Sequence, residues 1–304
     1  MTHDETLNEF DPLADLLETL DLHDADSTTG TDGTIRDRFT GRSQPTPHGR
    51  IFGGQVLAQS IIAAGRSVAC SREEEMNIHS HQVNYLHPGD PNIPLEFVVE
   101  RLRESRSYST RRVHILQNGR PILAAMSSFA RPNDGFDHQI EAPHVLGPEG
   151  LPSLSEDLYP MPATEPGNWV LRRAVEIRHV QGHVAFSPAS DPQETQQVWF
   201  KTIGELPDDS LLHAAILAYA SDWVLLDPVL RRHGIAWFDP RLRVASLDQT
   251  MWFHRRMRAD QWVMFNQSSP TAAHGRGLCL GHMYTADGTL GVTAAQEGMV
   301  HIRD

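Results

Sequence analysis

The chain has 304 residues, of which 39% are hydrophobic, so it can form two ordinary domains or one doubled domain with well-filled cores. The formal net charge is −13, and residues 1–33 hold ten acidic and no basic residues, so the rest of the chain is only mildly acidic. A protein that binds along the phosphate backbone of a nucleic acid needs a basic surface. The acidic charge balance therefore disfavours nucleic-acid binding.

The single lysine and the two cysteines limit the kinds of catalytic or metal-binding site that the chain can form. Only Lys201 could serve a Schiff base or a P-loop, and no G-x-x-x-x-G-K sequence precedes it. Cys70 and Cys279 are too few for a disulfide scaffold or a four-thiolate metal site, so we expect both to be reduced.

Sorting and membrane signals are not found in the sequence. The N-terminus is acidic from its fourth residue, where a secretory signal would carry positive charge, and the last three residues are not a peroxisomal tripeptide. There is no run of 18 apolar residues, so we expect no membrane span. These observations predict a cytoplasmic protein.

Residues 1–33 form an acidic leader, and residues 34–135 are predicted to form a first folded unit. Within the leader, leucines at 13, 16, 17 and 20 predict a short amphipathic helix over 12–22, and the small polar residues of 24–35 predict a flexible connection. An Ala-rich apolar run over 53–69 predicts one long helix. Alternating runs from Ile78 to Ala130, with a hairpin turn at Asn118-Gly119, predict an antiparallel meander.

The proline-rich range 136–190 is predicted to be a linker. Residues 191–304 are predicted to form a second unit with the same order of elements as the first. Residues 196–203 predict a strand and 210–234 a helix. Strand-like runs follow at 246–254, 261–268, 276–285 and 289–302, with a hairpin turn at Asp287-Gly288.

The two units can be aligned by counting. His87 and His254 end comparable strands with an offset of 167, and the two hairpin turns differ by 169. The offset of 167 also aligns Phe52-Gly53-Gly54-Gln55 with Tyr219-Ala220-Ser221-Asp222. The sequence therefore predicts an α+β protein made of two tandem structural repeats.

Several common sites are missing from the sequence. There is neither a G-x-S-x-G nucleophile elbow nor an H-E-x-x-H zinc motif. His79 and His81 lie on one face of a predicted strand, but no carboxylate cluster accompanies them, and half-buried histidines are the simpler interpretation. We therefore predict no metal site.

Three polar residues remain as candidates. Asp222 precedes a strongly apolar run, and the simpler interpretation is that Asp222 is the N-cap of a helix. Gln296 lies in a strand among small and apolar residues, where it could simply face solvent, and Ser246 begins another strand. The residues alone offer an acid, a hydroxyl and an amide, and give no reason to bring them together.

Six segments closely resemble the acyl-CoA thioesterase II family in order and spacing, over nearly the whole chain beyond the leader. They are RIFGGQVLAQSIIAAGRSV, HSHQVNYLHPGD, RESRSYSTRRVHILQNGRPIL, LLHAAILAYASDWVLL, SLDQTMWFHR and AAQEG. The resemblance implies a double hot-dog fold, in which each half is a long helix wrapped by an antiparallel sheet and the halves pack as a pseudo-dimer.

The resemblance also implies an active site of Asp, Thr and Gln that orients a water, with no cofactor. The Asp falls on Asp222, the Gln on Gln296 and the Thr on Ser246, which keeps the hydroxyl but loses the β-methyl. The first half has Gln55, His79 and Ser127 at the matching positions, so we expect one site per chain. Backbone N–H groups near Gly53-Gly54 are expected to bind substrate as oxyanion donors.

The expected activity is hydrolysis of fatty acyl-CoA to fatty acid and CoA. An acyl-CoA-binding protein with slow or no catalysis is the first alternative, which the change to Ser246 leaves open. An enoyl-CoA hydratase is the second, and it would need an Asp and His pair that we do not find near either helix start. The expected partner is the acyl-CoA substrate, and the resemblance implies a homo-oligomer formed through the sheets. The sequence leaves the chain-length preference open.

Overall fold

The computed structural model describes residues 10–31, 33–47, 49–73, 75–157 and 173–303. Residues 1–9 of the predicted leader and 158–172 of the predicted linker lie outside the described residues.

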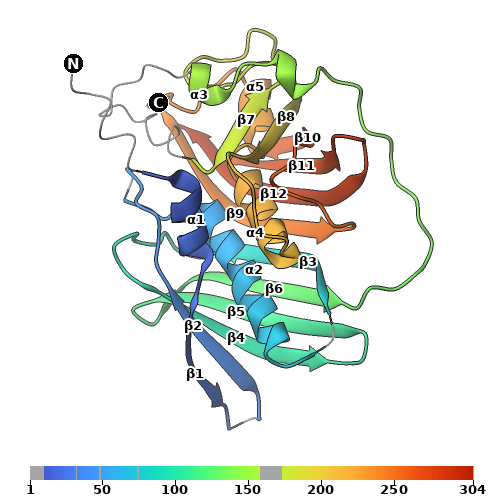
Figure 1. The fold of residues 1–304 in the computed structure, drawn as a ribbon. Helices are drawn as coiled ribbons and strands as arrows, with labels where there is room; N and C mark the ends of the chain where they lie inside the picture. Colours follow the sequence, from blue (N-terminus) through green and yellow to red (C-terminus); the bar gives the residue numbers. More distant parts are fainter. Residues whose placement is uncertain (1–9, 32, 48, 74, 158–172, 304) are drawn as a thin grey trace.

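The described residues form one antiparallel sheet with two long helices against one face (Figure 1). The helices are α1 (Pro12–Leu20), α2 (Gly53–Ala69), α3 (Leu154–Asp157), α4 (Ser210–Ser221) and α5 (Asp227–Arg232), with a 3-10 turn at Pro148–Gly150. The first six strands are β1 (His23–Thr29), β2 (Ile35–Gly41), β3 (Asn77–Tyr85), β4 (Leu95–Glu104), β5 (Tyr108–Gln117) and β6 (Arg120–Ala130). The other six are β7 (Val175–His179), β8 (Thr195–Thr202), β9 (Leu242–Phe253), β10 (Val263–Ala273), β11 (Arg276–Thr285) and β12 (Leu290–Ile302).

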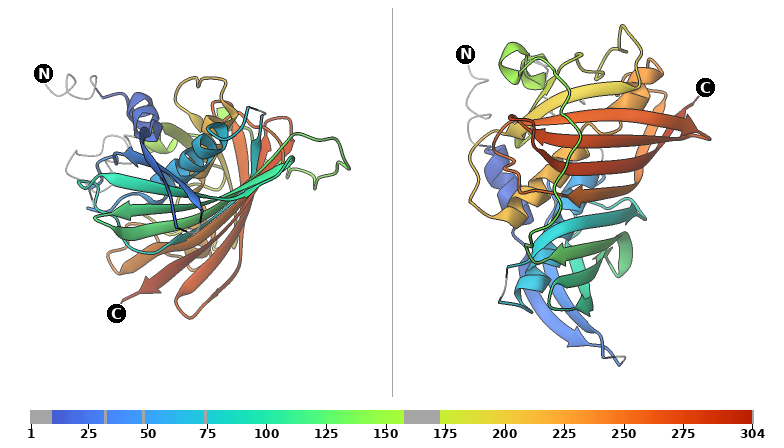
Figure 2. Two further views of the ribbon diagram at one scale, coloured as in Figure 1. Left: turned by 90° about the horizontal axis from the view of Figure 1, so that it is seen from below. Right: turned by 90° about the vertical axis from the view of Figure 1, so that its right-hand side faces the viewer.

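The strand order shows the repeat directly. It reads β1-β2-β4-β5-β6-β3-β9-β12-β11-β10-β8-β7, so β3 and β9 meet at the centre and each half continues outward in the same sequence of strands. The central pair is antiparallel, with His81 opposite Met251. Figure 2 shows how the sheet curves around the helices as one surface that crosses from the first half to the second. The predicted tandem layout is therefore present.

The helices α2 and α4 pack against each other in opposite directions between the two halves of the sheet. Gly65, near the end of α2, faces Leu211 at the start of α4, and a Cβ atom on Gly65 would lie 2.4 Å from the Leu211 side chain. At the other end, a Cβ atom on Gly54 would lie 2.7 Å from the carbonyl oxygen of Tyr219. Close packing of the helices therefore depends on residues without side chains at both ends.

The helix predicted over 210–234 is interrupted. It ends at Ser221, turns through 222–226 and resumes as α5. Pro228 has no N–H to donate to the carbonyl oxygen of Val224, so the hydrogen bonding of α4 cannot continue unbroken into α5. Asp222 is consequently the C-cap of α4 rather than an N-cap. The alignment of Phe52–Gln55 with Tyr219–Asp222 is also wrong, because it matches the start of α2 with the end of α4.

Two edges of the sheet differ from the sequence predictions. Part of the predicted flexible connection forms β1, which pairs with β2 although all its residues are exposed. Strand β7 lies inside the range 136–190 predicted as a linker and pairs with β8. Neither strand could be recognised from hydrophobic alternation, because Ala25 is the one apolar residue of β1 and β7 has only five residues.

The leader helix α1 is fixed to the body. Leu16 and Leu20 are buried, and so is Leu22 just beyond the helix. Asp11 caps the helix start, because its carboxylate accepts hydrogen bonds from the backbone N–H groups of Leu13 and Ala14.

We expect Leu16→Ala to lower the free energy of unfolding by about 2–5 kcal/mol, since Leu16 is fully buried and the substitution leaves a cavity. Leu13→Ala is the matched control, because Leu13 is only partly buried, and it should cost clearly less. Urea unfolding followed by circular dichroism measures both. Equal losses in the two variants would contradict the docking of α1 through Leu16.

Candidate active site

Asp222, Ser246 and Gln296 are brought together by the fold. The Gln296 side-chain Nε2 donates to Asp222 Oδ1 at 2.6 Å and to Ser246 Oγ at 3.0 Å. Ser246 Oγ donates to the same Asp222 Oδ1 at 3.1 Å. The three side chains close a triangle of hydrogen bonds, which fixes the carboxylate from two sides.

A β-bulge places Ser246 in this triangle. Strands β9 and β12 pair Gln249 with Gln296, and the register shifts between Glu297 and Gly298, so that Leu247 has no opposite partner. Side chains alternate between the two faces of a strand, and one extra residue reverses that alternation. The bulge therefore turns Ser246 toward the face that already carries Gln296.

The fourth element of the site is the start of α2. A Cβ atom on Gly53 would lie 2.7 Å from Asp222 Oδ2, so a side chain there would collide with the carboxylate. Next to it, the backbone N–H of Gly54 donates a hydrogen bond to Asp222. The first half of the chain thus contributes the N-terminus of a 17-residue helix to an acid that belongs to the second half.

The environment of Asp222 changes its acidity. Burial raises the pKa of Asp222 to about 6, against the opposing effect of the hydrogen bonds from Gln296, Ser246 and Gly54. A carboxyl group with this pKa is ionised at neutral pH and binds a proton readily, which is the behaviour that a general base needs.

Asp222, Ser246 and Gly53 line a cavity of about 810 Å³ to which both halves contribute. Tyr85, at the end of β3, also lines it, and burial together with the nearby Asp222 and Asp248 carboxylates raises the Tyr85 pKa well above its usual value. Its phenol therefore stays protonated. A cavity of this size accommodates a small organic ligand.

A histidine and an aspartate that sequence reasoning missed line the same cavity. His179 Nε2 lies 3.3 Å from Asp227 Oδ2, and Asp227 is the first residue of α5. The pair lies at the start of α5 and not at the start of α2 or α4, so it does not contradict the expectation for those two helix starts. The two residues are separated by 47 others. His179 lies in the range predicted as a linker and Asp227 inside the range predicted as one helix, so no spacing signal could have revealed their contact.

The first-half residues that the sequence predicted to match the site form no comparable site. Gln55 accepts a hydrogen bond from the backbone of Gln44 and donates to Gln59, and His79 contacts Ser128. Ser127 instead contacts His81, whose other ring nitrogen contacts Ser60. This last chain is fully buried, and burial lowers the pKa of His81 to about 3, so the ring is neutral at physiological pH.

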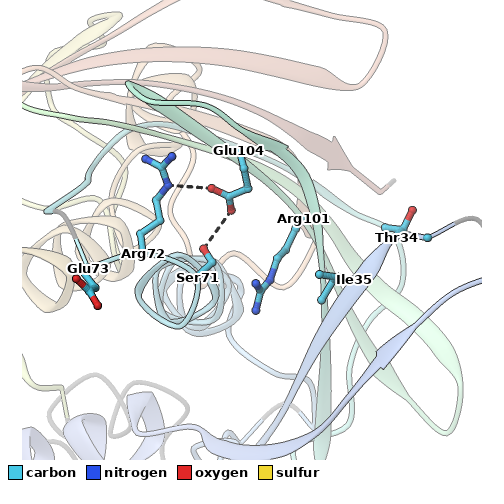
Figure 3. A pocket seen from close by; sticks show the side chains of 8 residues that line it. Thr34, Ile35, Ser71, Arg72, Glu73, Arg101 and Glu104 are labelled. Atoms are coloured by element: carbon cyan, nitrogen blue, oxygen red, sulfur yellow. Dashed lines mark hydrogen bonds and ion pairs between the residues drawn. The ribbon is translucent and has the colours of Figure 1, made fainter.

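A second pocket, of about 720 Å³, lies at the C-terminal end of α2 (Figure 3). The guanidinium groups of Arg72 and Arg101 line it, but Arg72 is paired with Glu104 and Arg101 with Asp37. Ser71 donates to the same Glu104. Because these groups neutralise one another, we assign no chemistry to this pocket. Among the described residues, no group of three or more His, Cys, Asp or Glu side chains is arranged to hold a metal ion.

The family models and the relatives that match this chain are consistent with one another. The family model described as acyl-CoA thioesterase matches residues 169–299, and the model described as acyl-CoA thioesterase N-terminal domain matches 42–130. Human acyl-coenzyme A thioesterase 8 is 34% identical, over 88% of this chain and 85% of its own length. Acyl-CoA thioesterase 2 of Haemophilus influenzae is also 34% identical, over 88% of this chain and 93% of its own.

Solved structures give the same result. A tesB protein of Mycobacterium avium subspecies paratuberculosis superposes with a TM-score of 0.75 at 29% identity, covering 95% of this chain and 99% of that one. The acyl-CoA thioesterase II TesB2 of Mycobacterium marinum has a TM-score of 0.72 at 32% identity with the same coverage. The fold is thus the double hot-dog of thioesterases, as predicted. The chain belongs to the acyl-CoA thioesterase family.

No helix in the described ranges is long and apolar enough to cross a bilayer.

The raised pKa of Asp222 predicts a pH-dependent cost to stability. Between the ordinary carboxyl pKa of 3.8 and about 6, the folded protein binds the proton more tightly than the unfolded chain, so stability falls as pH rises through this window. We therefore expect Asp222→Asn to melt at a higher temperature than the wild type at pH 7.5, and expect the difference to vanish near pH 4.

Scanning calorimetry at several pH values tests this expectation. Asp208→Asn is the control, because the Asp208 side chain is 95% exposed and should give a small difference without this pH dependence. A lower melting temperature of Asp222→Asn at pH 7.5 would show that the ionised carboxylate is stabilised, not destabilised, by its surroundings.

Proposed function

We propose that the protein hydrolyses fatty acyl-CoA thioesters to fatty acid and CoA, with Asp222, Ser246 and Gln296 as its catalytic residues. The observation that carries the proposal is the hydrogen-bonded triangle of these side chains, of which Asp222 and Ser246 line a cavity that both halves form. Family membership supports the reaction, and the geometry supports the choice of residues.

The carboxylate of Asp222 acts as the general base. It takes a proton from a water molecule as the water oxygen attacks the thioester carbonyl carbon. The tetrahedral intermediate then collapses, the bond from carbon to sulfur breaks, and the proton held by Asp222 passes to the CoA thiolate. The carboxylate is regenerated, and the balance needs only acyl-CoA and water.

Ser246 and Gln296 position the reacting groups. Both donate to Oδ1 of Asp222, which leaves Oδ2, on the side of Gly53, to receive the proton. Gln296 is fully buried and is not among the described residues that line the cavity, so it acts on the carboxylate and on Ser246 and not on the water. Holding the carboxylate in this way reduces the entropy lost on reaching the transition state.

The start of α2 stabilises the oxyanion in this proposal. The N–H of Gly54 is engaged with Asp222, which makes the N–H of Gly53 the donor to the carbonyl oxygen. The helix has 17 residues and no side-chain hydrogen bond at its N-cap, Phe52, so its positive end faces the site. Since neither glycine has a Cβ atom, substrate can approach the backbone closely.

In this proposal, the second unit, 191–304, carries the catalytic side chains, and the first, 34–135, supplies the cavity wall and the oxyanion donor. We also propose a cytoplasmic homo-oligomer. The outer face of the sheet supports association, because Met126, Trp252 and Leu280 are exposed there on β6, β9 and β11, each separated from the next by one strand. A slow acyl-CoA-binding protein is the alternative, which the intact triangle disfavours.

Activity should depend on pH through Asp222. We expect kcat/KM of the wild type to rise about tenfold per pH unit up to about pH 6 and then level off, since only the ionised carboxylate can accept a proton. Asp222→Asn should lower kcat by roughly 10²–10⁴ with little change in KM. Release of CoA, followed with a thiol reagent, measures both. Turnover near the wild-type rate in a folded Asp222→Asn variant would remove Asp222 from the mechanism.

Ser246 provides a second test through graded substitutions. Ser246→Ala should lower kcat about tenfold, because it removes the hydrogen bond to Asp222 and leaves a Gln296 N–H without its acceptor. Ser246→Thr should keep or raise activity, since the hydroxyl remains and the added methyl restricts its rotamers. If the Ala variant is as active as the wild type, the hydroxyl has no role in positioning.

A further inference from the structure

A buried contact outside the triangle of hydrogen bonds joins the end of α4 to β9. Gln249 Nε2 donates to Ser221 Oγ at 2.6 Å, and both side chains are fully buried. Ser221 is the last residue of α4 and directly precedes Asp222. No step of the proposed hydrolysis uses Gln249 or Ser221.

The donor and the acceptor in this contact are fixed by the surroundings of Ser221. Its hydroxyl has one hydrogen, and the carbonyl oxygen of Ala218 at 2.7 Å is a better acceptor for it than the Met251 sulfur at 3.9 Å. Toward Gln249, the hydroxyl oxygen can therefore only accept. The Gln249 amide turns its NH₂ group to the serine, and among the described residues no group donates to its buried Oε1.

A buried amide with an unsatisfied oxygen contributes little to the stability of the fold. Removing that oxygen from water costs free energy that a single hydrogen bond at the nitrogen roughly offsets. Methionine, which is also unbranched and of similar length, would fill the same space without this cost. The amide of Gln249 is therefore better explained by the group that it holds than by a gain in folding.

Gln249 connects the end of the helix to the strands that carry the rest of the site. It shares β9 with Ser246 and lies directly opposite Gln296 on β12. Asp222 accepts hydrogen bonds from these two strands, and its neighbour in the chain, Ser221, is tied to β9 through Gln249. Because α4 ends at Ser221, this contact holds the end of the helix against the sheet at the point where the acid follows.

The first half of the chain has a corresponding contact. Ser60 on α2 contacts Nε2 of His81 at 2.8 Å, and its hydroxyl donates to the carbonyl oxygen three residues earlier, as the hydroxyl of Ser221 does. Both partners stand two residues after a β-bulge, His81 in β3 and Gln249 in β9. The two contacts are therefore structural equivalents.

The residue after the serine differs between the two halves. Ser60 is followed by Ile61, which is fully buried, and α2 continues to Ala69. Ser221 is followed by Asp222, the acid of the site, where the helix has ended. The contact in the first half thus anchors a helix, whereas the contact in the second half also determines where a carboxylate lies.

We infer that Gln249 is a positioning residue, which acts through Ser221 to hold the Asp222 carboxylate within the triangle of hydrogen bonds. This inference rests on the proposed function, because it concerns the same site. Gln249 and Ser221 are not among the described residues that line the cavity, so their effect on the reaction passes through Asp222.

Gln249→Met removes the donor to Ser221 and keeps an unbranched side chain. We expect kcat for octanoyl-CoA to fall about tenfold with little change in KM, since the contact acts on the base and not on the bound substrate. The melting temperature should not fall, because the variant also removes the unsatisfied Oε1. Release of CoA and scanning calorimetry measure the two effects.

Ser221→Ala removes the same contact from the other side and should lower kcat by a similar factor. The double variant should be no slower than either single variant, because two residues that act as a unit are not additive. Ser60→Ala is the matched control in the first half and should leave kcat within about twofold. Circular dichroism verifies folding, and Ser221→Ala still tests the inference if Gln249→Met does not fold. Losses that multiply in the double variant, or an equal loss in Ser60→Ala, overturn the inference.

Proton binding by Asp222 gives a readout that does not depend on turnover. The hydrogen bonds from Gln296 and Ser246 lower the pKa of Asp222 against the effect of burial, so a loosened carboxylate should titrate at higher pH. Carbon-13 NMR of aspartate-labelled protein measures the titration midpoint, and Asp222→Asn identifies the signal. We expect the midpoint to rise in Gln249→Met and to stay unchanged in Ser60→Ala.

The two readouts separate this inference from the proposed function. If the protein hydrolyses no thioester but the midpoint of Asp222 rises in Gln249→Met, the hydrolytic function fails and the positioning of the carboxylate stands. If the wild type hydrolyses octanoyl-CoA and Gln249→Met changes neither kcat nor the midpoint, the positioning role fails and the hydrolytic function stands. In an active enzyme the inference requires both changes, and either one alone overturns it.

Discussion

The contact between the start of α2 and the end of α4 is the constraint on which the site depends. Two helices from different halves of the chain meet there, and the carboxylate of Asp222 lies so close to the backbone that only glycine fits at position 53. The positive end of one helix and the acid at the end of the other are thereby held together. The other two residues of the site, Ser246 on β9 and Gln296 on β12, hydrogen-bond to the same carboxylate.

Much of this architecture could be predicted from the pattern of apolar residues. The Ala-rich run with two leading glycines gave the correct bounds of α2, and the alternating runs around Asn118-Gly119 and Asp287-Gly288 correspond to paired strands. These signals are local, because hydrophobic periodicity and turn residues act over a few positions. The family resemblance supplied what locality could not, namely that Asp222, Ser246 and Gln296 meet.

Other features depend on tertiary contacts and left no readable trace. Strand β1 is polar and fully exposed, and it is a strand because β2 offers it an unpaired edge. The bulge at Leu247, which turns Ser246 inward, is set by the register between β9 and β12. The contact between His179 and Asp227 joins two elements that are far apart in the chain, and a single sequence contains no signal for such a long-range contact.

The continuous sheet across β3 and β9 has a consequence for how the site is assembled. In a dimer of separate hot-dog subunits, a cavity between two chains exists only above the dissociation constant, whereas here both walls belong to one polypeptide and their effective concentration is fixed by covalent linkage. Dilution cannot take the glycines of α2 away from Asp222. In a homodimer of identical subunits, every substitution appears on both sides of the cavity. In this single chain a substitution appears in one half only, so the two halves can differ. One half could therefore keep the acid while the other specialised as the helix that faces it.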